Sequence, residues 1–433
     1  MRSHFRAVFD FKKEELPGAL LLFSFFFFVM VAFQSLKSQK KALFVESYGA
    51  DLELYAKLLN IALAAAAMMV FTYLYNHLPR QRLIYVLCAF FAAGFLLLAW
   101  RLRDPGRPEI WTFYLLGDLL STLMVAAFFA YLTDISNADQ AKRLYGVIGG
   151  GGVLGGLAGA ALTAALLEPA GLSALLLLAA LWMGTVAAVT YQAERYVVRS
   201  GVFTQRGQLR LTEKAMAKKE SRFSAAVEGA RLVSRSRYLA AIVGIMAFYE
   251  IASQSIDYQF SHVSEALSGL RETQVFLANV SLVTNLAAVV VQFILVSLIM
   301  RKLGLVVALL ILPVAVTGGS LGFLMAPGLL AASLLFISDN GLNYSLQQTA
   351  RESLYVVTTP DEKYKARAFT NMFVQRFAKG VAILGLLGLL RASVDIRYLS
   401  LITIASAVLV MLCGVYAGRR FEQRGVQPAR KAA

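Results

Sequence analysis

The chain has 433 residues, of which 58% are apolar and only 16% are charged, and its mean hydropathy is +0.63. Soluble domains of this total length need more polar surface to cover their cores, so the composition excludes them and indicates a membrane protein. The net charge of +16 would also suit a nucleic-acid-binding protein, and the placement of the charges has to decide between the two.

The first apolar run extends over residues 16–36. A bilayer core needs about 20 apolar residues per helix, and the apolar core of a secretory signal is shorter. Because no small-residue cleavage site follows this run, we expect a retained first span. Further runs of spanning length follow along the chain. The predicted spans are 17–36, 54–76, 83–101, 110–132, 145–167, 171–193, 238–260, 273–300, 303–325, 328–350, 368–390 and 398–418.

A polar, basic segment divides these spans into six and six. It predicts an N-terminal half over 1–193, a basic cytoplasmic linker over 194–237 and a C-terminal half over 238–433. Part of the linker, residues 211–237, is expected to form an amphipathic helix on the membrane surface. Basic turns follow the second and the eighth span at matching places. We therefore predict an all-α membrane protein of about 12 transmembrane helices in two six-helix halves, the major-facilitator-type architecture.

The basic residues are distributed unevenly between the two sides of the membrane. With both termini in the cytoplasm, 30 of the 42 lysines and arginines fall in cytoplasmic segments and 9 fall on the opposite side. This asymmetry is the positive-inside pattern, and it accounts for the net charge without any nucleic-acid partner. The remaining three cations, Lys57, Arg376 and Lys379, fall within spans, where a charge is costly unless it meets a partner or a water-filled cavity.

Three lysines, Lys37, Lys40 and Lys41, follow the first span on the non-cytoplasmic side. They form either a solvated basic turn or a cationic cluster that receives an anionic substrate, and the sequence leaves both interpretations open. Lys57, with Asn60 after it, lies near the start of the second span, where its side chain could extend to the membrane surface.

Acidic and polar residues lie within several other spans. Asp118 lies in the fourth span, and exposing a carboxylate there to lipid costs about 2.5–3.5 kcal/mol. In the seventh span, helical spacing puts three polar residues on one face, and the tenth and eleventh spans each carry a similar stripe. These residues are Glu250, Gln254 and Asp257, then Asp339, Asn340, Asn343 and Gln347, and finally Arg376 and Lys379. They form either an anion-binding cavity or a structural network.

The densest glycine run, residues 149–159, lacks the Lys-Ser/Thr that a phosphate-binding loop requires. Gly151, Gly155 and Gly159 share one helix face, so we expect them to let a neighbouring helix approach closely. The two cysteines and three histidines match no metal or disulfide pattern, and no catalytic signature occurs. We expect neither an enzyme nor a bound cofactor.

Four segments carry a family resemblance. They are "LKSQKKALFVESYGADLELYAKLLN" (36–60), "YLLGDLLSTL" (114–123), "AKRLYGVIGGGG" (141–152) and "RESLYVVTTPDEKYKARAFTNMFVQRFAKG" (351–380). The chain resembles the bacterial and plastid-type ATP/ADP translocases over most of its membrane portion. The resemblance implies a major-facilitator fold that exchanges nucleotides, typically ATP against ADP, with lysines and arginines holding phosphate oxygens.

By this resemblance, the residues that recognise the nucleotide are Lys40 (or Lys41), Asp118, Glu250 and Lys379. The sequence departs from the family after the seventh-span acid, where Asp257 stands in a stretch that usually carries lysines. An added negative charge there should weaken binding of a polyphosphate. The fourth-span acid is also the shorter Asp.

Three functional hypotheses follow. The first is a nucleotide antiporter, the second a transporter of another anionic or amphipathic metabolite on the same fold, and the third a membrane scaffold that does not transport. For the transporter we expect a small anionic substrate, a monomer in the lipid bilayer, and a bacterial plasma membrane with both termini cytoplasmic.

Overall fold

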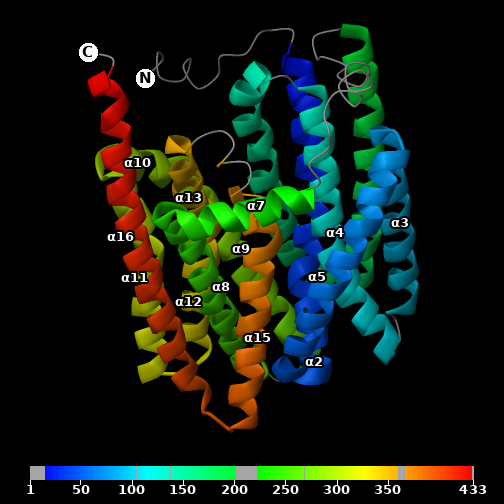
Figure 1. Ribbon diagram of the computed structural model, residues 1–433. Helices are drawn as coiled ribbons and strands as arrows, with labels where there is room; N and C mark the ends of the chain where they lie inside the picture. The colour runs from blue at the N-terminus through cyan, green and yellow to red at the C-terminus, as the bar shows by residue number, and fades with distance from the viewer. Residues whose placement is uncertain are drawn as a thin grey trace. The chain divides into compact units, whose positions relative to one another are not determined.

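The protein is all α-helical in the computed structural model (Figure 1), which describes residues 15–102, 105–136, 138–200, 222–267, 269–358, 362, 366–367 and 369–431. Eight helices in this described part are long and apolar enough to cross a membrane, which confirms a multi-pass membrane protein. The number of crossings, about twelve, stays a prediction. Residues 201–221 of the predicted linker and several positions between 359 and 368 of the last quoted motif lie outside the described residues.

Helix α2 (Leu16–His77) is the first element, and it begins with a proline in its first turn, where a missing backbone N–H costs nothing. It contains both of the first two predicted spans and is bent at Gly49, whose φ of 79° and ψ of 165° are accessible to glycine and costly for other residues. Of the two interpretations left open for Lys37, Lys40 and Lys41, the solvated turn is wrong. These residues continue the helix because Ala42, Leu43 and Phe44 beyond them are buried.

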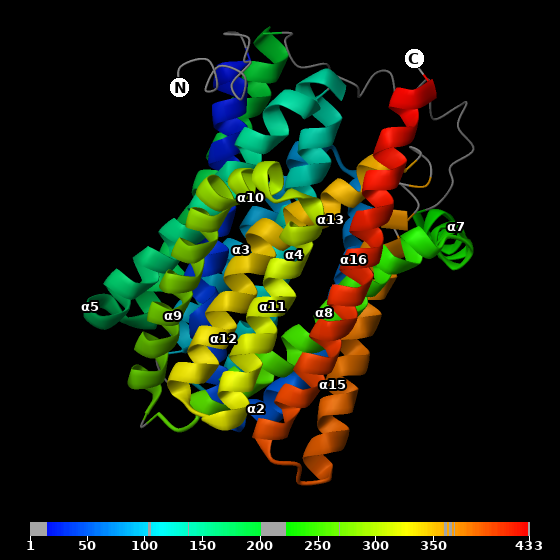
Figure 2. The same cartoon turned by 90° about the vertical axis from the view of Figure 1, so that its left-hand side faces the viewer.

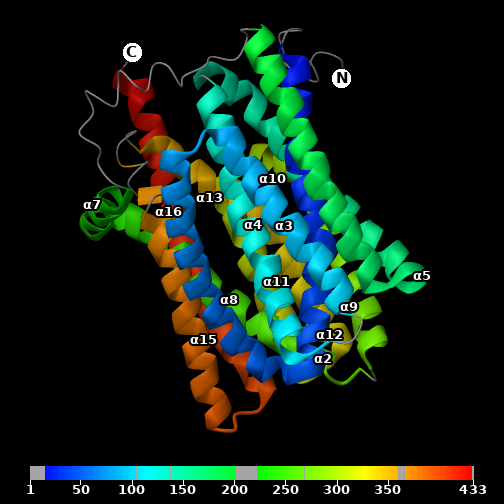
Figure 3. The same cartoon turned by 90° about the vertical axis from the view of Figure 1, so that its right-hand side faces the viewer.

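The next three helices are α3 (Arg80–Arg101), α4 (Arg107–Ile135) and α5 (Ala138–Ser200). Helix α5 is bent at Gly171 and contains the fifth and sixth predicted spans. Figure 3 shows α3 beside α4 and α5, with which it packs. An added Cβ at Gly155 would lie 2.3 Å from the carbonyl oxygen of Phe27 in α2, and Gly151 and Gly159 are similarly close to α2 carbonyls. The predicted packing role of this glycine face is confirmed.

The rest of the chain forms shorter helices, several of which are interrupted by π-helical turns. In order they are α7 (Arg222–Arg235), α8 (Arg237–Ser264), α9 (Leu270–Val290), η1 (Val291–Leu295), α10 (Val296–Lys302), α11 (Gly304–Met325), α12 (Leu329–Leu342), η2 (Asn343–Gln347), α13 (Gln348–Leu354), η3 (Tyr355–Val357), η4 (Thr370–Val374), α15 (Gln375–Arg391), η5 (Ile396–Tyr398) and α16 (Leu399–Lys431). Figure 2 shows α16 alongside α8 and α11, with which it makes extensive contacts.

The contacts divide the chain into two compact units. Unit 1 comprises Met1–Ser47, Ala62–Lys218 and Gly269–Asn285, and unit 2 comprises Tyr48–Ile61, Lys219–Ser268 and Leu286–Ala433. Two short segments therefore pack away from the half that their place in the sequence would suggest. Residues 48–61 follow the first predicted span and belong to unit 2, while residues 269–285 follow the seventh predicted span and belong to unit 1.

Polar contacts and one apolar cluster hold the segment 48–61 in unit 2. The Tyr258 hydroxyl donates to Asp51 at 2.6 Å, and the Ser261 hydroxyl donates to Glu53 at 2.7 Å. Ala50 and Leu54 are buried in a cluster with residues of α8, α15 and α16. These two hydrogen bonds and the apolar contacts fix the segment in position as part of unit 2.

The segment 269–285 is attached to unit 1 in a comparable way. The Gln34 side-chain amide donates to the Ser281 hydroxyl at 3.0 Å, and the Gln39 amide donates to the backbone oxygen of Gln274 at 3.4 Å. The Thr273 hydroxyl donates to Glu46 at 3.3 Å. Three side-chain hydrogen bonds to α2 thus tie this part of α9 to unit 1.

Candidate functional site

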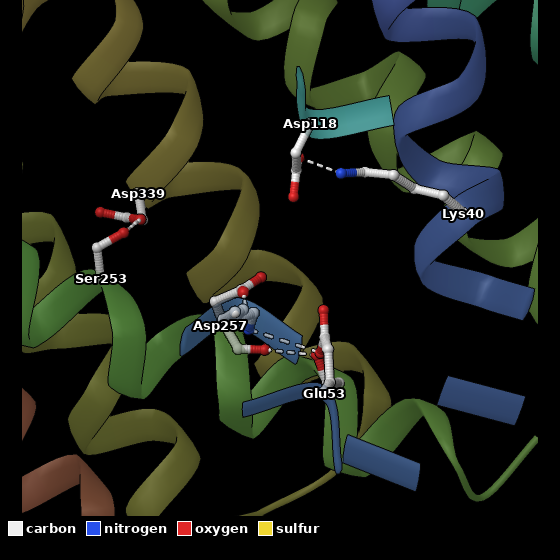
Figure 4. A network of polar contacts seen from close by, with 8 residues as sticks. Lys40, Glu53, Asp118, Ser253, Asp257 and Asp339 are labelled. Atoms are coloured by element: carbon white, nitrogen blue, oxygen red, sulfur yellow. Dashed lines mark hydrogen bonds and ion pairs between the residues drawn. The ribbon is translucent and has the colours of Figure 1, made fainter. Parts of the chain in front are cut away.

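In unit 1, the predicted residues Lys40 and Asp118 form an ion pair. Lys40 in α2 is 6% exposed in its side chain, whereas Asp118 in α4 is 26% exposed. Figure 4 shows the two side chains pointing toward each other from these helices. The Lys40 amine also lies 4.9 Å from the centre of the Tyr114 ring, which adds a cation–π contact. The ammonium thus contacts the Tyr114 ring and the carboxylate of Asp118, which is partly exposed.

A glycine makes room for this lysine. An added Cβ at Gly117 would lie 2.8 Å from the Lys40 Cδ atom, so the lysine stem packs directly on the α4 backbone next to Asp118. Lys37 and Lys41 are half-buried on the same helix, on either side of Lys40. Of the three lysines, the structure therefore places Lys40 deepest inside unit 1.

In unit 2, Lys57 lies between two carboxylates. Its amine is 2.5 Å from Asp257 in α8 and 3.5 Å from Glu53 one turn earlier in α2. The lysine side chain is 7% exposed and Asp257 is 26% exposed. The Lys57 side chain therefore does not extend to the membrane surface. It is buried in protein, and its amine contacts the carboxylate of Asp257 instead. Asn60, one turn further along α2, is half-buried.

The seventh-span acid Glu250 is buried in α8 and is 7% exposed. The Gln375 side-chain amide of α15 donates a hydrogen bond to its carboxylate at 2.8 Å. The positive charges of Lys379 and Arg351 also act on this carboxylate. The structure thus brings Glu250 into the same neighbourhood of unit 2 as the predicted cation Lys379.

Arg376 and Lys379 are half-buried in α15. Among the described residues, neither forms an ion pair or a hydrogen bond with another side chain. A cation without a carboxylate partner can bind an anionic ligand directly, because no counter-ion has to be displaced first. These two side chains differ in this respect from Lys40 and Lys57.

A second buried acid, Asp339 in α12, accepts a hydrogen bond from the Ser253 hydroxyl of α8 at 3.0 Å (Figure 4). Asp339 is 1% exposed, and its other oxygen has no hydrogen-bond partner in the described part of the protein. Gln254 in α8 is buried as well, and its side-chain oxygen also has no hydrogen-bond partner among the described residues. The predicted polar stripes of α8 and α12 thus meet in unit 2.

The polar stripe continues from α12 into the π-helical turn η2. Within the described residues, the side-chain oxygen of Asn343 and both polar atoms of the Gln347 amide have no hydrogen-bond partner. Gln347 is 0% exposed, whereas the Asn340 amide is satisfied by the backbone oxygen of Phe336. π-Helical turns occur frequently at functional sites, and unpaired buried polar groups are rare in folded proteins.

Sequence reasoning missed four contributors to these networks. Glu53 is four residues before Lys57, and that spacing is a signal for a helical ion pair that could have identified it. Ser253 and Gln375 are common residue types in helices, and only the three-dimensional arrangement shows their acidic partners. Nothing in the sequence distinguishes Tyr114 from the apolar residues of its predicted span. In the described part, no group of three or more potential metal ligands is present.

A family model described as TLC ATP/ADP transporter matches residues 2–102 and 109–331 of this chain. The matched part includes Lys40, Lys57, Asp118, Glu250 and Asp257. The predicted polar residues of α12, η2 and α15 lie beyond it.

Among proteins of known sequence, this chain is similar to ADP,ATP carrier protein 1 of Chlamydia pneumoniae. The two are 23% identical over 440 residues, covering 87% of this chain and 85% of the relative. The protein of the same name from Chlamydia muridarum is 24% identical, covering 84% of this chain and 80% of the relative. ADP,ATP carrier protein 1 of Rickettsia bellii is 26% identical over 167 residues, which are 32% of this chain and 33% of that one.

Among solved structures, the chain is similar to a POT family transporter in complex with a thioalcohol-conjugated peptide. The TM-score is 0.60 at 12% identity, with 92% of this chain and 95% of the other covered. A bacterial homologue of the iron transporter ferroportin gives a TM-score of 0.59 at 13% identity, with 93% and 99% covered. These likenesses confirm the predicted all-α membrane fold, which this chain shares with the two solved proteins.

Proposed function

Since this chain belongs to the TLC ATP/ADP transporter family, we propose that it is a secondary transporter that exchanges nucleotides, ATP against ADP, across a membrane by alternating access. The relatives named as ADP,ATP carriers support this substrate class, because two of them are similar over most of their length. Transport, and not catalysis, is the activity that we assign to the chain.

The observation that carries the proposal is the state of the two cations in α15. Arg376 and Lys379 lie within a predicted span, where a charge without a role is costly. Neither is paired with a carboxylate among the described residues, so both can form charge-assisted hydrogen bonds to phosphate oxygens. Lys379 lies close enough to Glu250 for the lysine charge to act on the carboxylate. Glu250 would therefore neutralise the charge of Lys379 after the nucleotide leaves.

The paired lysines have a different proposed role. Lys40 and Lys57 are each held by an aspartate that is 26% exposed, so an arriving phosphate could compete with Asp118 or Asp257 for the ammonium. We propose as substrate-binding residues, each within its own unit, Lys37, Lys40, Lys41, Lys57, Asn60, Asp118, Glu250, Asp257, Asp339, Asn343, Arg376 and Lys379.

The ion pair between Lys57 and Asp257 supports a second candidate substrate class. Asp257 neutralises a cation that a polyphosphate would otherwise use, so a less highly charged anion or an amphipathic metabolite would bind better than ATP. The nucleotide panel in the assay below distinguishes the two classes.

Exchange in proteoliposomes tests the proposal. Radiolabelled ATP should enter vesicles loaded with ADP and should not enter empty vesicles. Lys379→Ala should lower uptake by at least about tenfold, the loss expected from one charged hydrogen bond. Lys302→Ala, which removes an exposed cation at the end of α10, should leave uptake unchanged.

Equal uptake by the Lys379→Ala variant and the unmodified protein would assign a structural role to this lysine. Absence of exchange with every nucleotide tested, alongside exchange of a phosphorylated sugar or an organic anion, would favour the second substrate class. Absence of any transport would favour a scaffold. We further propose that the protein is monomeric, binds no nucleic acid, and lies in a bacterial plasma membrane with both termini in the cytoplasm.

A further inference from the structure

A basic pocket of about 420 Å³ lies in unit 2, away from the candidate substrate-binding residues. It is formed where α7 ends, α8 begins and α16 passes beside them. Its cationic lining consists of Arg235, Arg237 and Arg420, and its other walls include Tyr238 and Tyr416. None of its lining residues in the described part of the chain is acidic.

The three arginines of this basic pocket are available to an anion. All three are exposed, and in the described part of the chain none of them pairs with a carboxylate. The Arg420 guanidinium lies 5.8 Å from the centre of the Tyr416 ring, which orients it over that side chain. The negative end of the α7 dipole and the positive end of the α8 dipole meet at this corner, so the arginine side chains determine the charge of the pocket. The pocket is therefore complementary to a phosphate group.

An apolar groove continues from the basic pocket along α16. The groove has a volume of about 630 Å³ and is lined by Val408, Met411, Leu412 and Val415. It shares Tyr416, Arg420 and Gln423 with the basic pocket. Leu412 is 62% exposed. A ligand that fills both spaces must carry an anionic head and an apolar tail.

Helix α7 runs across the direction of the apolar helix α8, as a helix at a membrane surface would. Figure 1 shows it running crosswise to α8, and the other two views agree. Within its described side chains, Val233 is buried while Arg231, Ser234 and Arg235 are exposed. An amphipathic helix with arginines on its polar face lies where lipid headgroups are found.

A related pocket with a tyrosine–arginine pair beside it lies in unit 1, at the end of α5. A pocket of about 460 Å³ is lined there by Leu21, Arg195, Tyr196 and Arg199, among others. Arg195 lies 5.4 Å from the ring centre of Tyr191, four residues before it, just as Arg420 lies over Tyr416. The Tyr-x-x-x-Arg spacing is thus repeated at the ends of the sixth and twelfth predicted spans, but of these two tyrosines only Tyr416 lines the pocket beside it.

We propose that the pocket formed by Arg235, Arg237 and Arg420 binds an anionic phospholipid, with the headgroup phosphate on the three arginines and an acyl chain along the groove of α16. A soluble phosphate would use the basic pocket and leave the apolar groove empty, whereas a phospholipid fills both. Basic pockets between spans at the cytoplasmic surface are suited to such headgroups.

Native mass spectrometry of the full chain in detergent tests this site, with phosphatidylglycerol and phosphatidylcholine added in separate titrations. The triple variant R235Q/R237Q/R420Q should bind phosphatidylglycerol at least about tenfold more weakly, since each basic residue near a headgroup contributes measurably to binding. Phosphatidylcholine adducts should be unchanged. The control variant R301Q/K302Q/R391Q removes three exposed cations elsewhere and should bind both lipids as the unmodified protein does.

An equal loss of phosphatidylglycerol binding in both triple variants would show that net charge, and not this pocket, determines binding. That result would overturn the proposal. Unchanged binding of phosphatidylglycerol in R235Q/R237Q/R420Q would also overturn it, since the three arginines would then hold no lipid headgroup. An unfolding midpoint temperature equal to that of the unmodified protein shows that each variant is folded. Among the described residues, the three arginines form no ion pair whose loss would disturb folding. Because the assay measures no transport, its result is independent of the proposed nucleotide exchange.

Discussion

The two buried lysines lie against aspartates that are each 26% exposed. An unpaired ammonium inside a membrane protein is costly, and its pair with a carboxylate removes most of that cost. The partially exposed acid is the side of each pair that solvent or a ligand can reach. The pairs therefore have a structural function, and under the proposed exchange an anion has to displace the aspartate to reach the ammonium.

Replacing Lys57 should destabilise unit 2 more than replacing its partner. Lys57→Met leaves Glu53 and Asp257 without their shared cation, which should cost about 3–5 kcal/mol of unfolding free energy. Asp257→Asn leaves Lys57 within 3.5 Å of Glu53, so its cost should be smaller. Unfolding in detergent, followed by circular dichroism, measures both. The double variant should recover part of the Lys57→Met loss, and a strictly additive double variant would show that the residues are not coupled.

Gln347 allows stability and function to be separated at a single position. Both polar atoms of its amide are buried without a partner among the described residues, so Gln347→Leu should keep or slightly raise the unfolding temperature. If the amide is kept for a ligand, the same variant should lose transport. Gln348→Leu, at the exposed neighbouring position, should change neither quantity. A less stable but fully active Gln347→Leu variant would indicate a structural amide.

At the scale of helices, the glycine face of α5 determines how closely α2 approaches. Carbonyl groups of α2 occupy the space that a side chain would need at Gly151, Gly155 and Gly159. Carbonyl oxygens belong to a hydrogen-bonded backbone, so they cannot move aside as the end of a flexible side chain can. The period of four residues in this glycine run was therefore a reliable guide to a helix contact.

Gly155→Ala should destabilise unit 1 by about 1–3 kcal/mol, the usual cost of inserting an atom into a packed core. Its added Cβ would lie 2.3 Å from the Phe27 carbonyl oxygen. Gly149→Ala is the matched control, because nothing lies within 4 Å of its Cβ position and alanine favours the helix. The midpoint temperature of unfolding should fall for the first variant only. A comparable fall for both would mean that helix propensity, and not contact, decides the outcome.

For the whole molecule, the distribution of basic residues predicts orientation. In a variant without Cys88 and Cys413, a cysteine at Lys302 should react with a membrane-impermeant maleimide only from the cytoplasmic side. A cysteine at Arg397, in the connection between α15 and α16, should react only from the opposite side, because the positive-inside pattern places these two segments across the bilayer. Labelling of intact cells and of inverted vesicles measures this, and reversed accessibility would contradict the assigned orientation.

The membrane fold was accessible from the sequence because the bilayer imposes a length and an apolar composition on every crossing. The same reasoning placed Asp118, Glu250 and Lys379 among the polar residues within spans. It failed at residues 37–52, where the charges suggested a loop and the structure has a continuous helix bent at Gly49. Charge density alone does not end a helix when the residues beyond it are apolar and buried.

What the sequence by itself determined is the presence of long apolar helices and the few charged positions within them, since both follow from local composition and the solvent properties of lipid. The tertiary structure alone decided which charges neutralise each other. Lys40 finds Asp118 and Lys57 finds Asp257 across intervals of 78 and 200 residues. It also decided that residues 48–61 pack in unit 2. The physical reason is that an ion pair depends on distances set by helix packing, and periodicity along one helix carries no information about them.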